Sequence, residues 1–480
     1  MLKYLSSFPH KALKGQILLE TLIFSSIAAL FIAGLATWGA LTLKAAMQSV
    51  DRELAIQIAE AGINYYRWHL AHAPQDYKDG TNNPGPYAHS FKDKDGNAIG
   101  QFMLTIIPPP IGSTLVTIQS TGQLNASTTL YRKLEARLAI PSLAKYAVVA
   151  NDKMRFGAGT EVFGPIHSND GIRFDGLAHN IISSTKASYV DPDHGGSAEF
   201  GVHTHVAPVD PLPPAAVPNR PDVFQAGRQF PVPAVDFSGM TSDLATIKTN
   251  AQASGRYFAP SGSLGYHIIL KTNGTFDLYK VNSLVAPPGG CSNAASGWGT
   301  WSISGGGEQF LQNYAFPGNG LVFVEDNLWV DGQVNNARLT VASGRFPDNP
   351  ATRSSITVNN NLSYTNYNGS DVLALIAQNN VNVGLKSLDT QRIDAALVAQ
   401  NGRAGRYFYS SNCGTGYVRS TLTLYGMIAT NLRYGFAYVC GCSGYTTRNI
   451  SYDANLLYGP PPSFPLAGSQ YTTLSWKEIK

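Results

Sequence analysis

The sequence predicts a mainly β protein that starts with one long helix, and three observations support this fold class. Charged residues make up only 14% of the 480-residue chain, while Gly (47) and Pro (28) are plentiful, a mix that favours strands and tight turns. Residues 17–43 form a long apolar run, and helix-forming sequence is scarce beyond residue 72. Short β-type runs between Asn- and Gly-containing turns recur over residues 146–460. We therefore expect a long N-terminal transmembrane and amphipathic α-helix, a small β-meander and a large exported, β-helix-like (solenoid) body.

The N-terminal segment predicts a membrane anchor. Residues 1–15 are short and basic, with lysines at positions 3, 11 and 14. The apolar run at 17–43 would form a helix about 40 Å long, which is enough to span a bilayer with tilt. Because lysines mark the cytoplasmic side, the chain after residue 44 should lie outside the cytoplasm.

The same helix is expected to continue to residue 72. Residues 44–72 contain no proline, and Pro74 with the Gly- and Asn-rich residues after it should end the helix. Apolar residues at three- and four-residue steps predict a packing stripe made of Ala46, Val50, Leu54, Ile58 and Ala61. We expect one helix over 16–72.

Glu20 is the one charged residue between Lys14 and Lys44, and it needs an explanation. A lone charge inside a bilayer costs several kcal/mol. A cleaved secretory signal would need a small-residue site after the apolar run, but the Ala-Gly-Leu-Ala at 33–36 is followed by more apolar sequence. A plain signal anchor leaves Glu20 unexplained, and a transporter carboxylate would need further spanning helices that the sequence lacks.

Residues 14–20, Lys-Gly-Gln-Ile-Leu-Leu-Glu, resemble the class III signal of type IV pilins and pilin-like proteins. The resemblance implies processing at Lys14, Gly15 and Gln16: a prepilin peptidase cuts after Gly15 on the cytoplasmic side. Gln16 then becomes the N-terminus and Glu20 the fifth residue. It also implies residence in inner-membrane lipid, followed by assembly with other pilin subunits on the pilus assembly platform.

Cleavage would give Glu20 an assembly role. It would free an α-amino group with a pKa of about 7.7–8.0. In a bundle of such helices, the Glu20 carboxylate of one subunit can neutralise the ammonium of its neighbour, because a buried pair is tolerable where a lone charge is not. The carboxylate would thus select for assembly and set the axial stagger of the subunits.

Residues 73–145 predict a small antiparallel sheet. Runs at 100–107, 114–121 and 128–140 alternate in part and are separated by turn residues, which is typical of a three-stranded meander. In pilin-like proteins such a sheet packs on the outer half of the long helix. The alternative is that this sheet begins the next domain.

The exported body divides into residues 146–316, residues 317–460 and a C-terminal tail, 461–480. Strings such as DVLALIAQNNVNVG (371–384) suggest a solenoid of parallel strands or a sandwich, and we prefer the solenoid although no strict period appears. Several strings resemble the exported region of large PilX-type pilin-like proteins. The first region carries a Pro-rich insert at 206–236 and a short helix at 240–254.

The four cysteines, Cys291, Cys413, Cys440 and Cys442, are disulfide candidates in an exported chain. Four cysteines allow three connectivities, and the sequence does not choose among them. We favour Cys413 bridging to one of the Cys440/Cys442 pair and Cys291 to the other, because one glycine separates that pair. Zinc is the alternative, but no matching His/Cys pair lies nearby.

His203 and His205 are the only metal-ligand candidates that the sequence singles out. In a strand, side chains two residues apart face one side, which suits a metal. The side chains that could complete such a site are those of His167, Asp191, Asp193 and His194. A polar loop at the edge of the body explains the same residues, so we expect no metal and no cofactor.

The sequence offers little sign of catalysis. A polysaccharide lyase or hydrolase needs a carboxylate pair or a calcium-bound Asp cluster, and the candidates are scattered: Asp326, Asp331, Asp389 and Asp394. No nucleophile-elbow, Walker or zincin motif is present. We expect no catalytic residue. Without Lys3, Lys11 and Lys14 the chain is almost neutral, 32 basic (35 minus 3) against 31 acidic residues, so nucleic acid is not an expected partner.

These observations predict a minor pilin or pilin-like subunit of a type IV pilus or pseudopilus, which carries a β-rich domain for tip, priming or adhesion roles. It would be a single-pass protein of the cytoplasmic membrane with its bulk outside, reaching the cell surface after assembly. Trp298, Trp301 and the Tyr-rich loops 405–417 and 434–445 could contact a surface glycan or protein. The alternative is a membrane-anchored β-helix that binds or cleaves surface polysaccharide.

Overall fold

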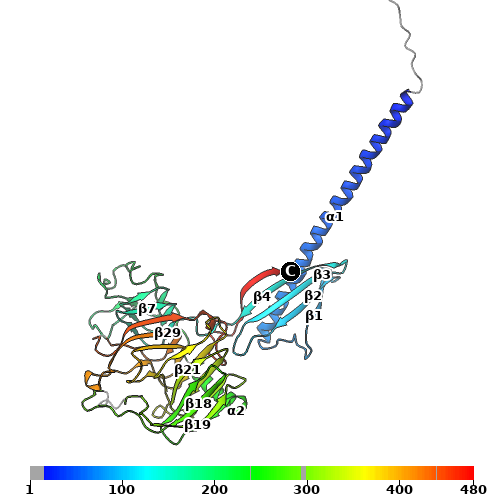
Figure 1. Ribbon diagram of the computed structural model, residues 1–480. Helices are drawn as coiled ribbons and strands as arrows, with labels where there is room; N and C mark the ends of the chain where they lie inside the picture. The colour runs from blue at the N-terminus through cyan, green and yellow to red at the C-terminus, as the bar shows by residue number, and fades with distance from the viewer. Residues whose placement is uncertain (1–15, 238, 293–298, 439) are drawn as a thin grey trace, which may run out of the picture. The chain divides into compact units, whose positions relative to one another are not determined.

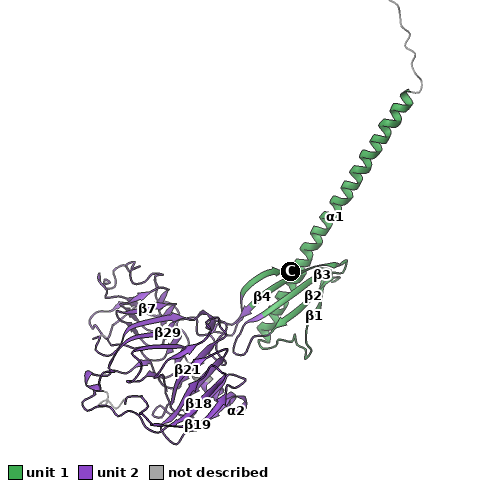
Figure 2. Ribbon diagram, viewed as in Figure 1, with its two compact units in different colours: residues 1–107, 117–137, 474–480 green, residues 108–116, 138–473 purple. Residues whose placement is uncertain are grey.

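The computed structural model describes residues 16–237, 239–292, 299–438 and 440–480. The expected leader, with Lys14 and Gly15, and also Trp298 lie outside the described residues. The protein is mainly β, with one long apolar helix at the N-terminal end (Figure 1). It divides into two compact units, unit 1 with residues 1–107, 117–137 and 474–480, and unit 2 with residues 108–116 and 138–473 (Figure 2).

Helix α1 spans Gln16–His72 and begins where the described residues begin. No proline interrupts it, and Pro74 follows two residues after its end. Within the apolar stretch, the hydroxyls of Thr21, Thr37 and Thr42 donate hydrogen bonds to backbone carbonyls four residues earlier. These hydroxyls therefore need no water, which suits an apolar environment.

Unit 1 holds a five-stranded sheet in the order β1-β2-β3-β4-β31. The strands are β1 (Tyr87–Lys92), β2 (Ala98–Ile107), β3 (Val116–Leu124), β4 (Ser127–Ala139) and β31 (Thr472–Ile479). The expected three-stranded meander is therefore extended at both edges. β1 was missed because its outward residues are exposed and partly polar. The expected C-terminal tail, 461–480, ends in a strand beside β4, a long-range pairing that no local pattern announces.

Only the second half of α1 packs against this sheet (Figure 1). Its buried residues are Ala55, Ile58, Ala59, Gly62, Ile63, Tyr66 and Leu70. Small residues bring the backbones together: a Cβ at Gly122 of β3 would lie 2.2 Å from the carbonyl oxygen of Ala55. The expected stripe shares only Ile58 with the buried set, and Ala46 and Val50 are exposed.

The body, unit 2, is built from ladders of parallel strands. One ladder runs through β16 (Arg256–Phe258), β20 (Leu321–Val324), β22 (Arg338–Ser343), β25 (Val372–Ala377), β27 (Thr390–Ala399), β29 (Val418–Thr430), β5 (Val148–Ala150), β8 (Ile166–Ser168), β11 (Ile182–Ser184) and β15 (Arg228–Gln229). The first strand of the body, β5, thus pairs with the late strand β29. The expected regions 146–316 and 317–460 lie within this one unit.

Further parallel ladders share strands with the first. A second ladder adds β17 (Gly265–Leu270), β21 (Leu328–Val334), β24 (Leu362–Tyr364), β30 (Gly444–Tyr452), β7 (Thr160–Phe163) and β10 (Leu177–Ala178). Shorter ladders contain β23 (Ile356–Thr357), β26 (Val381–Val383) and β28 (Ala404–Arg406), and also β6 (Met154–Phe156), β9 (Ile172–Phe174) and β14 (Val202–His203). Antiparallel pairs involve β18 (Thr275–Val281), β19 (Glu308–Ala315), β12 (Ser188–Tyr189) and β13 (Glu199–Phe200).

Aliphatic residues stack in register along the first ladder and form the main core. The column of directly paired residues is Val322, Val341, Leu375, Leu397, Ile428, Val148, Ile166 and Ile182. The alternate residues of the same strands, such as Phe323 and Val398, enter a second core on the other face. Burial on both faces explains why these strands read as continuous apolar runs.

Helix α2 (Gly239–Ser254) covers the second core. Leu244, Ile247 and Ala251 are buried there together with Phe323. The helix begins one residue before the expected range 240–254. Among the described strands no sheet closes on itself, and the solenoid stays a prediction.

Candidate functional site

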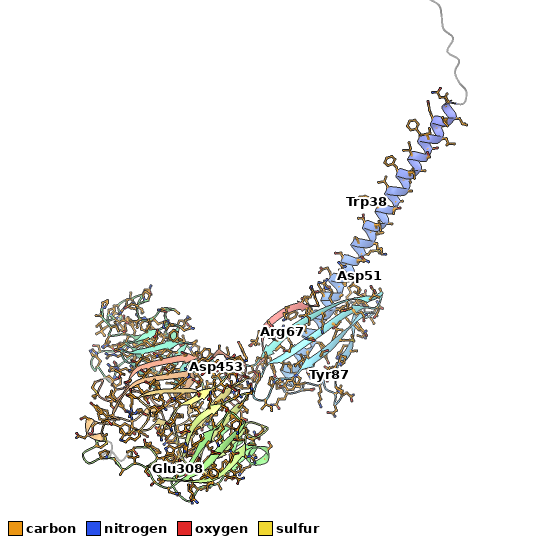
Figure 3. All side chains as sticks on the ribbon, in the orientation of Figure 1. Trp38, Asp51, Arg67, Tyr87, Glu308 and Asp453 are labelled. Atoms are coloured by element: carbon orange, nitrogen blue, oxygen red, sulfur yellow. A yellow bond between two sulfur atoms is a disulfide. The ribbon has the colours of Figure 1, made fainter. Side chains whose placement is uncertain are left out.

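The bare part of α1, residues 16–50, presents its side chains to the surroundings. Every residue in this stretch is exposed, including Leu18, Leu30 and Trp38 (Figure 3). Within the described part of the chain, α1 is the helix long and apolar enough to cross a membrane. The structure thus leaves this apolar surface to be covered from outside the chain.

Glu20 lies on the bare part of α1, one helical turn after Gln16. The side-chain amide of Gln16 donates a 3.4 Å hydrogen bond to the Glu20 carboxylate. No ion pair to Glu20 exists among the residues that the structure describes. The Gln16 amide is neutral, so this contact does not balance the Glu20 charge.

A second candidate site, the His-carboxylate cluster, consists of Asp191, Glu199, His203 and His205. One ligand-type atom from each of the four side chains lies within 4.8 Å of the others. The pairing of β12 with β13 sets Glu199 opposite Tyr189, and β14 runs parallel to β9 so that His203 pairs with Arg173. Local strand pairing therefore gathers the four side chains.

Short contacts join the members of the cluster. Nε2 of His205 lies 2.7 Å from Oε1 of Glu199, and Nε2 of His203 lies 2.5 Å from Oε2 of the same carboxylate. Nε2 of His203 also lies 3.8 Å from Oδ2 of Asp191. His203 is 1% exposed and Glu199 is 6% exposed, so bulk water reaches neither group freely.

Charged groups around the cluster favour ionised carboxylates. Burial raises the pKa of the Asp191 carboxyl, but hydrogen bonds from the Asp193 backbone amide and the Arg173 guanidinium help to outweigh it and hold that pKa well below its usual range. The Arg173 guanidinium donates to Asp191 at 3.3 Å. Burial also raises the pKa of Tyr189, whose ring contacts the ring of His203.

The structure brings together only some of the residues that the sequence singled out. His203, His205 and Asp191 meet, while Glu199 is a member that the sequence reasoning missed. The available signal was a carboxylate four residues before the first histidine. His194 lies at the rim, with Nδ1 3.4 Å from Glu199, and Asp193 pairs with Arg155 and Arg433 instead. His167 lies outside the cluster, where Ser183 and Asn169 hydrogen-bond its ring.

A cavity of about 580 Å³ opens in the same unit. Its lining includes four guanidinium groups, from Arg155, Arg403, Arg433 and Arg448, and two carboxylates, from Asp175 and Asp193. Residues of the Tyr-rich loop 434–445 also line it, although the rings of Tyr434, Phe436 and Tyr445 are buried in the core. The backbone amide of His205 donates to Asp175, which links the cavity wall to the cluster.

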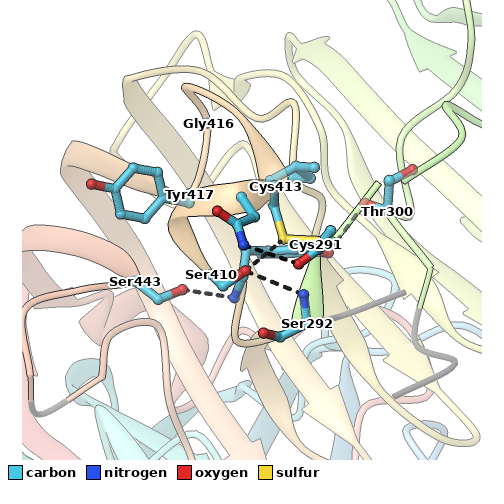
Figure 4. Close-up of a disulfide and its surroundings, with 12 residues drawn as sticks. Cys291, Ser292, Thr300, Ser410, Cys413, Gly416, Tyr417 and Ser443 are labelled. Atoms are coloured by element: carbon cyan, nitrogen blue, oxygen red, sulfur yellow. Dashed lines mark hydrogen bonds between the residues drawn. A yellow bond between two sulfur atoms is a disulfide. The ribbon is translucent and has the colours of Figure 1, made fainter. Parts of the chain in front are cut away.

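All four cysteines are disulfide-bonded, but the expected pairing is wrong. Cys291 pairs with Cys413 (Figure 4). Cys440 pairs with Cys442. Cys291 and Cys413 are buried beside Leu385 and Tyr409, contacts that the sequence did not reveal. The Cys-Gly-Cys bridge becomes reachable because Gly441 has a positive φ of 62°, which turns the chain back on itself.

The scattered carboxylates each have structural partners. Asp326 accepts hydrogen bonds from Ser261 and pairs with Arg345, while Asp331 lies 3.2 Å from His267. Asp389 accepts from Ser420, and Asp394 accepts from Tyr367 and Arg392. Trp301, an expected contact residue, is half-buried and its ring stacks on Tyr407.

Comparison with known proteins gives a structural similarity. No family model matches the chain, and no curated protein matches its sequence. Among solved structures, the chain is similar to the competence-associated pilin ComZ from Thermus thermophilus, with 12% sequence identity over 89% of this chain and 98% of that chain and a TM-score of 0.29. A TM-score this low carries no inference about the present chain.

Proposed function

We propose that this protein is a minor pilin or pilin-like subunit of the large PilX type. A prepilin peptidase removes the leader after Gly15, and α1 then joins other pilin helices in a type IV pilus or pseudopilus. Before assembly the protein is a single-pass protein of the cytoplasmic membrane, and its body lies outside.

One observation carries the proposal: the bare part of α1 is an apolar surface whose single carboxylate, Glu20, has no ion-pair partner among the described residues. A bilayer would cover the apolar side chains and leave Glu20 as a lone charge. A bundle of processed helices would cover both, because each new α-amino group can neutralise the Glu20 of a neighbour. The second half of α1 is already occupied by the unit 1 sheet, so only residues 16–50 are available for such a bundle.

The proposal gives the body the task of display and adhesion, without catalysis. Its parallel ladders and in-register aliphatic column support the finer proposal that the strands form coils of a solenoid. A unit of residues 138–473 is large for a subunit that repeats along a fibre, which favours a tip or priming position.

The state of the N-terminus tests processing. A mass spectrum of the protein from its native membrane should show a chain that begins at Gln16. A Gly15→Leu variant should keep its leader and stay in the membrane, because the proposed cleavage site is lost. A wild-type chain found intact from Met1, or cut after residue 36, would contradict the proposal.

Substitution of Glu20 tests assembly. Glu20→Ala should be processed normally but disappear from sheared surface fibres analysed by peptide mapping. Ser25→Ala is the matched control, since Ser25 lies on the same bare part and its hydroxyl bonds only within the helix. Equal recovery of wild type and Glu20→Ala from fibres would refute the assembly role.

The cavity favours a second candidate, a membrane-anchored protein that binds acidic surface polysaccharide. Four guanidiniums against two carboxylates leave two positive charges on its wall. The purified chain should then bind an acidic polysaccharide such as polygalacturonate more tightly than a neutral glucan, and Arg403→Ala should weaken this binding. Equal affinity for the acidic and neutral polymers would remove this candidate.

A further inference from the structure

Two buried polar atoms of the His-carboxylate cluster have no hydrogen-bond partner among the described residues. Nε2 of His203 and Oε2 of Glu199 lie 2.5 Å apart without hydrogen-bond alignment. Neither atom has another hydrogen-bond partner among the described residues. Burial of these two polar atoms is not compensated by a hydrogen bond, so a ligand that contacts both atoms would stabilise the cluster.

The tautomer of His203 points to what that ligand is. Nδ1 of His203 lies 3.2 Å from the backbone carbonyl oxygen of Phe200, which can only accept a hydrogen bond. In a neutral ring Nδ1 therefore carries the proton, and Nε2 presents its lone pair to the carboxylates. A backbone carbonyl that fixes the other ring nitrogen in this way is the usual outer partner of a metal-binding histidine.

The net charge of the cluster and its Arg173 neighbour also favours a bound cation. Asp191 and Glu199 bring two negative charges, and Arg173 returns one positive charge through its bond to Asp191. One negative charge is left over in a buried place. Either a second proton on His203 or a metal ion could balance this charge.

We propose that Asp191, Glu199, His203 and His205 bind one Zn²⁺ ion. Two imidazoles and two carboxylates are ligands that zinc accepts, and imidazole is a poor ligand for Ca²⁺ or Mg²⁺. Tetrahedral bonds of about 2.0–2.1 Å place ligand atoms about 3.4 Å apart, inside the 4.8 Å spread of the cluster. With four protein ligands the site is closed, which is typical of structural zinc.

The ion would fix the conformation of one loop of the body, residues 191–205. All four ligands lie within residues 191–205, which begin just after β12 and end two residues after β14, and β14 pairs with β9. Arg433 and Arg155 form ion pairs with Asp193 in the same loop, and both arginines also line the cavity. Zinc therefore stabilises the loop that contributes Asp193 to the cavity lining, a role that does not depend on pilus assembly.

Metal analysis of the full chain, purified in detergent, tests the proposal. After incubation with Zn²⁺ and gel filtration, plasma mass spectrometry should find about one zinc per chain. Co²⁺ in its place should give the strong visible absorption of a four-coordinate ion. Removal of zinc with a chelator should lower the melting temperature, and Zn²⁺ should restore it. Zinc far below one equivalent in folded wild type would overturn the proposal in favour of a protonated His203.

Variants show whether the zinc is held here. His203→Ala and the more accessible His205→Gln should each lose zinc, with affinity falling by more than the about 10- to 100-fold that loss of an outer partner costs. His179→Ala is the matched control, because His179 pairs with a single carboxylate, Glu161, away from the cluster. His205→Gln keeps the test valid if His203→Ala does not fold. Wild-type zinc content in both cluster variants would also overturn the proposal.

Discussion

Leucine side chains are exposed in the bare part of α1 and buried in the body. Leu30 of α1 is 73% exposed, whereas Leu375 of β25 is fully buried and stacks between Val341 and Leu397. The apolar residues of the body's parallel ladders are mostly buried against one another. Those of the bare part are covered by none of the described residues.

Charged groups show the same contrast. Arg406 is fully buried in the body, and its guanidinium donates to the carbonyls of Tyr417 and Leu385. Glu20 on the bare part has only an amide beside it. The body thus satisfies this buried charge with its own backbone, whereas the bare part leaves Glu20 without an ion-pair partner among the described residues.

The disulfide between Cys291 and Cys413 should give the largest effect on the stability of the body. It closes a loop with a sequence separation of 122, so the chain-entropy model assigns it about 5 kcal/mol. Denaturant unfolding of the Cys291→Ser/Cys413→Ser double variant should show this loss. The matched Cys440→Ser/Cys442→Ser variant, whose separation is 2, should lose only about 1 kcal/mol. Equal losses would show that the long bridge does not restrain the body.

Leu375→Ala should come next, with a loss of about 4 kcal/mol in the free energy of unfolding. The substitution leaves a cavity in the in-register column, where both neighbours are fixed by parallel pairing. Denaturant unfolding in detergent measures the change. A loss below about 1 kcal/mol would mean that the column does not form the core.

Substitution of two glycines in unit 1 tests which part of α1 is closely packed. Gly122→Val should destabilise unit 1 by about 3 kcal/mol, because its Cβ would lie 2.2 Å from one backbone atom of α1 and 2.4 Å from another. Gly34→Val is the control, since a Cβ there meets nothing within 4 Å. Thermal unfolding, followed by the circular-dichroism signal of the strands, should give a lower melting temperature for Gly122→Val than for Gly34→Val. Similar melting temperatures would contradict the close packing of Gly122 against α1.

The pH dependence of the body's stability should follow His267. Burial disfavours its charged form, but hydrogen bonds to Asp331 and Glu308 outweigh burial and raise the pKa of His267 to about 9 from 6.5. A raised pKa in the folded state stabilises the protein fully below pH 6.5, and this contribution is lost as the pH rises toward 9. Between pH 6 and 8.5 the loss should be about 2 kcal/mol. His267→Gln should flatten this part of the profile, and an unchanged slope would exclude His267 as its source.

Leu30→Ala should have the smallest effect on folding. Its side chain is exposed on the bare part, so the free energy of unfolding should change by less than about 0.5 kcal/mol. The same variant should assemble less well, because the lost side chain would have been covered in a bundle. A clear drop in unfolding stability would show that the bare part is covered within the chain.

Local sequence patterns predicted much of the fold but little of the His-carboxylate cluster. The apolar run and Pro74 predicted α1, and continuous runs such as residues 371–377 predicted buried strands. The buried stripe of α1 was misplaced because it depends on where Gly122 and its sheet meet the helix. The pair His203 and His205 was visible, but Glu199 joins them only through the pairing of β13 and β14 with their neighbours.

The sequence by itself determined the long apolar N-terminal helix and the single carboxylate within its apolar run, because both are set by consecutive residues. It also determined the mainly β class, because turn residues and β-branched runs act over a few neighbours. The tertiary structure alone decided the disulfide pairing, the joining of β31 to the unit 1 sheet and the meeting of four metal-type ligands. The Cys291–Cys413 pairing and the place of β31 depend on which distant segments lie side by side, whereas the four ligands meet because residues 191–205 fold onto one another and onto β9. The loop-closure and packing terms that settle these arrangements involve many residues at once.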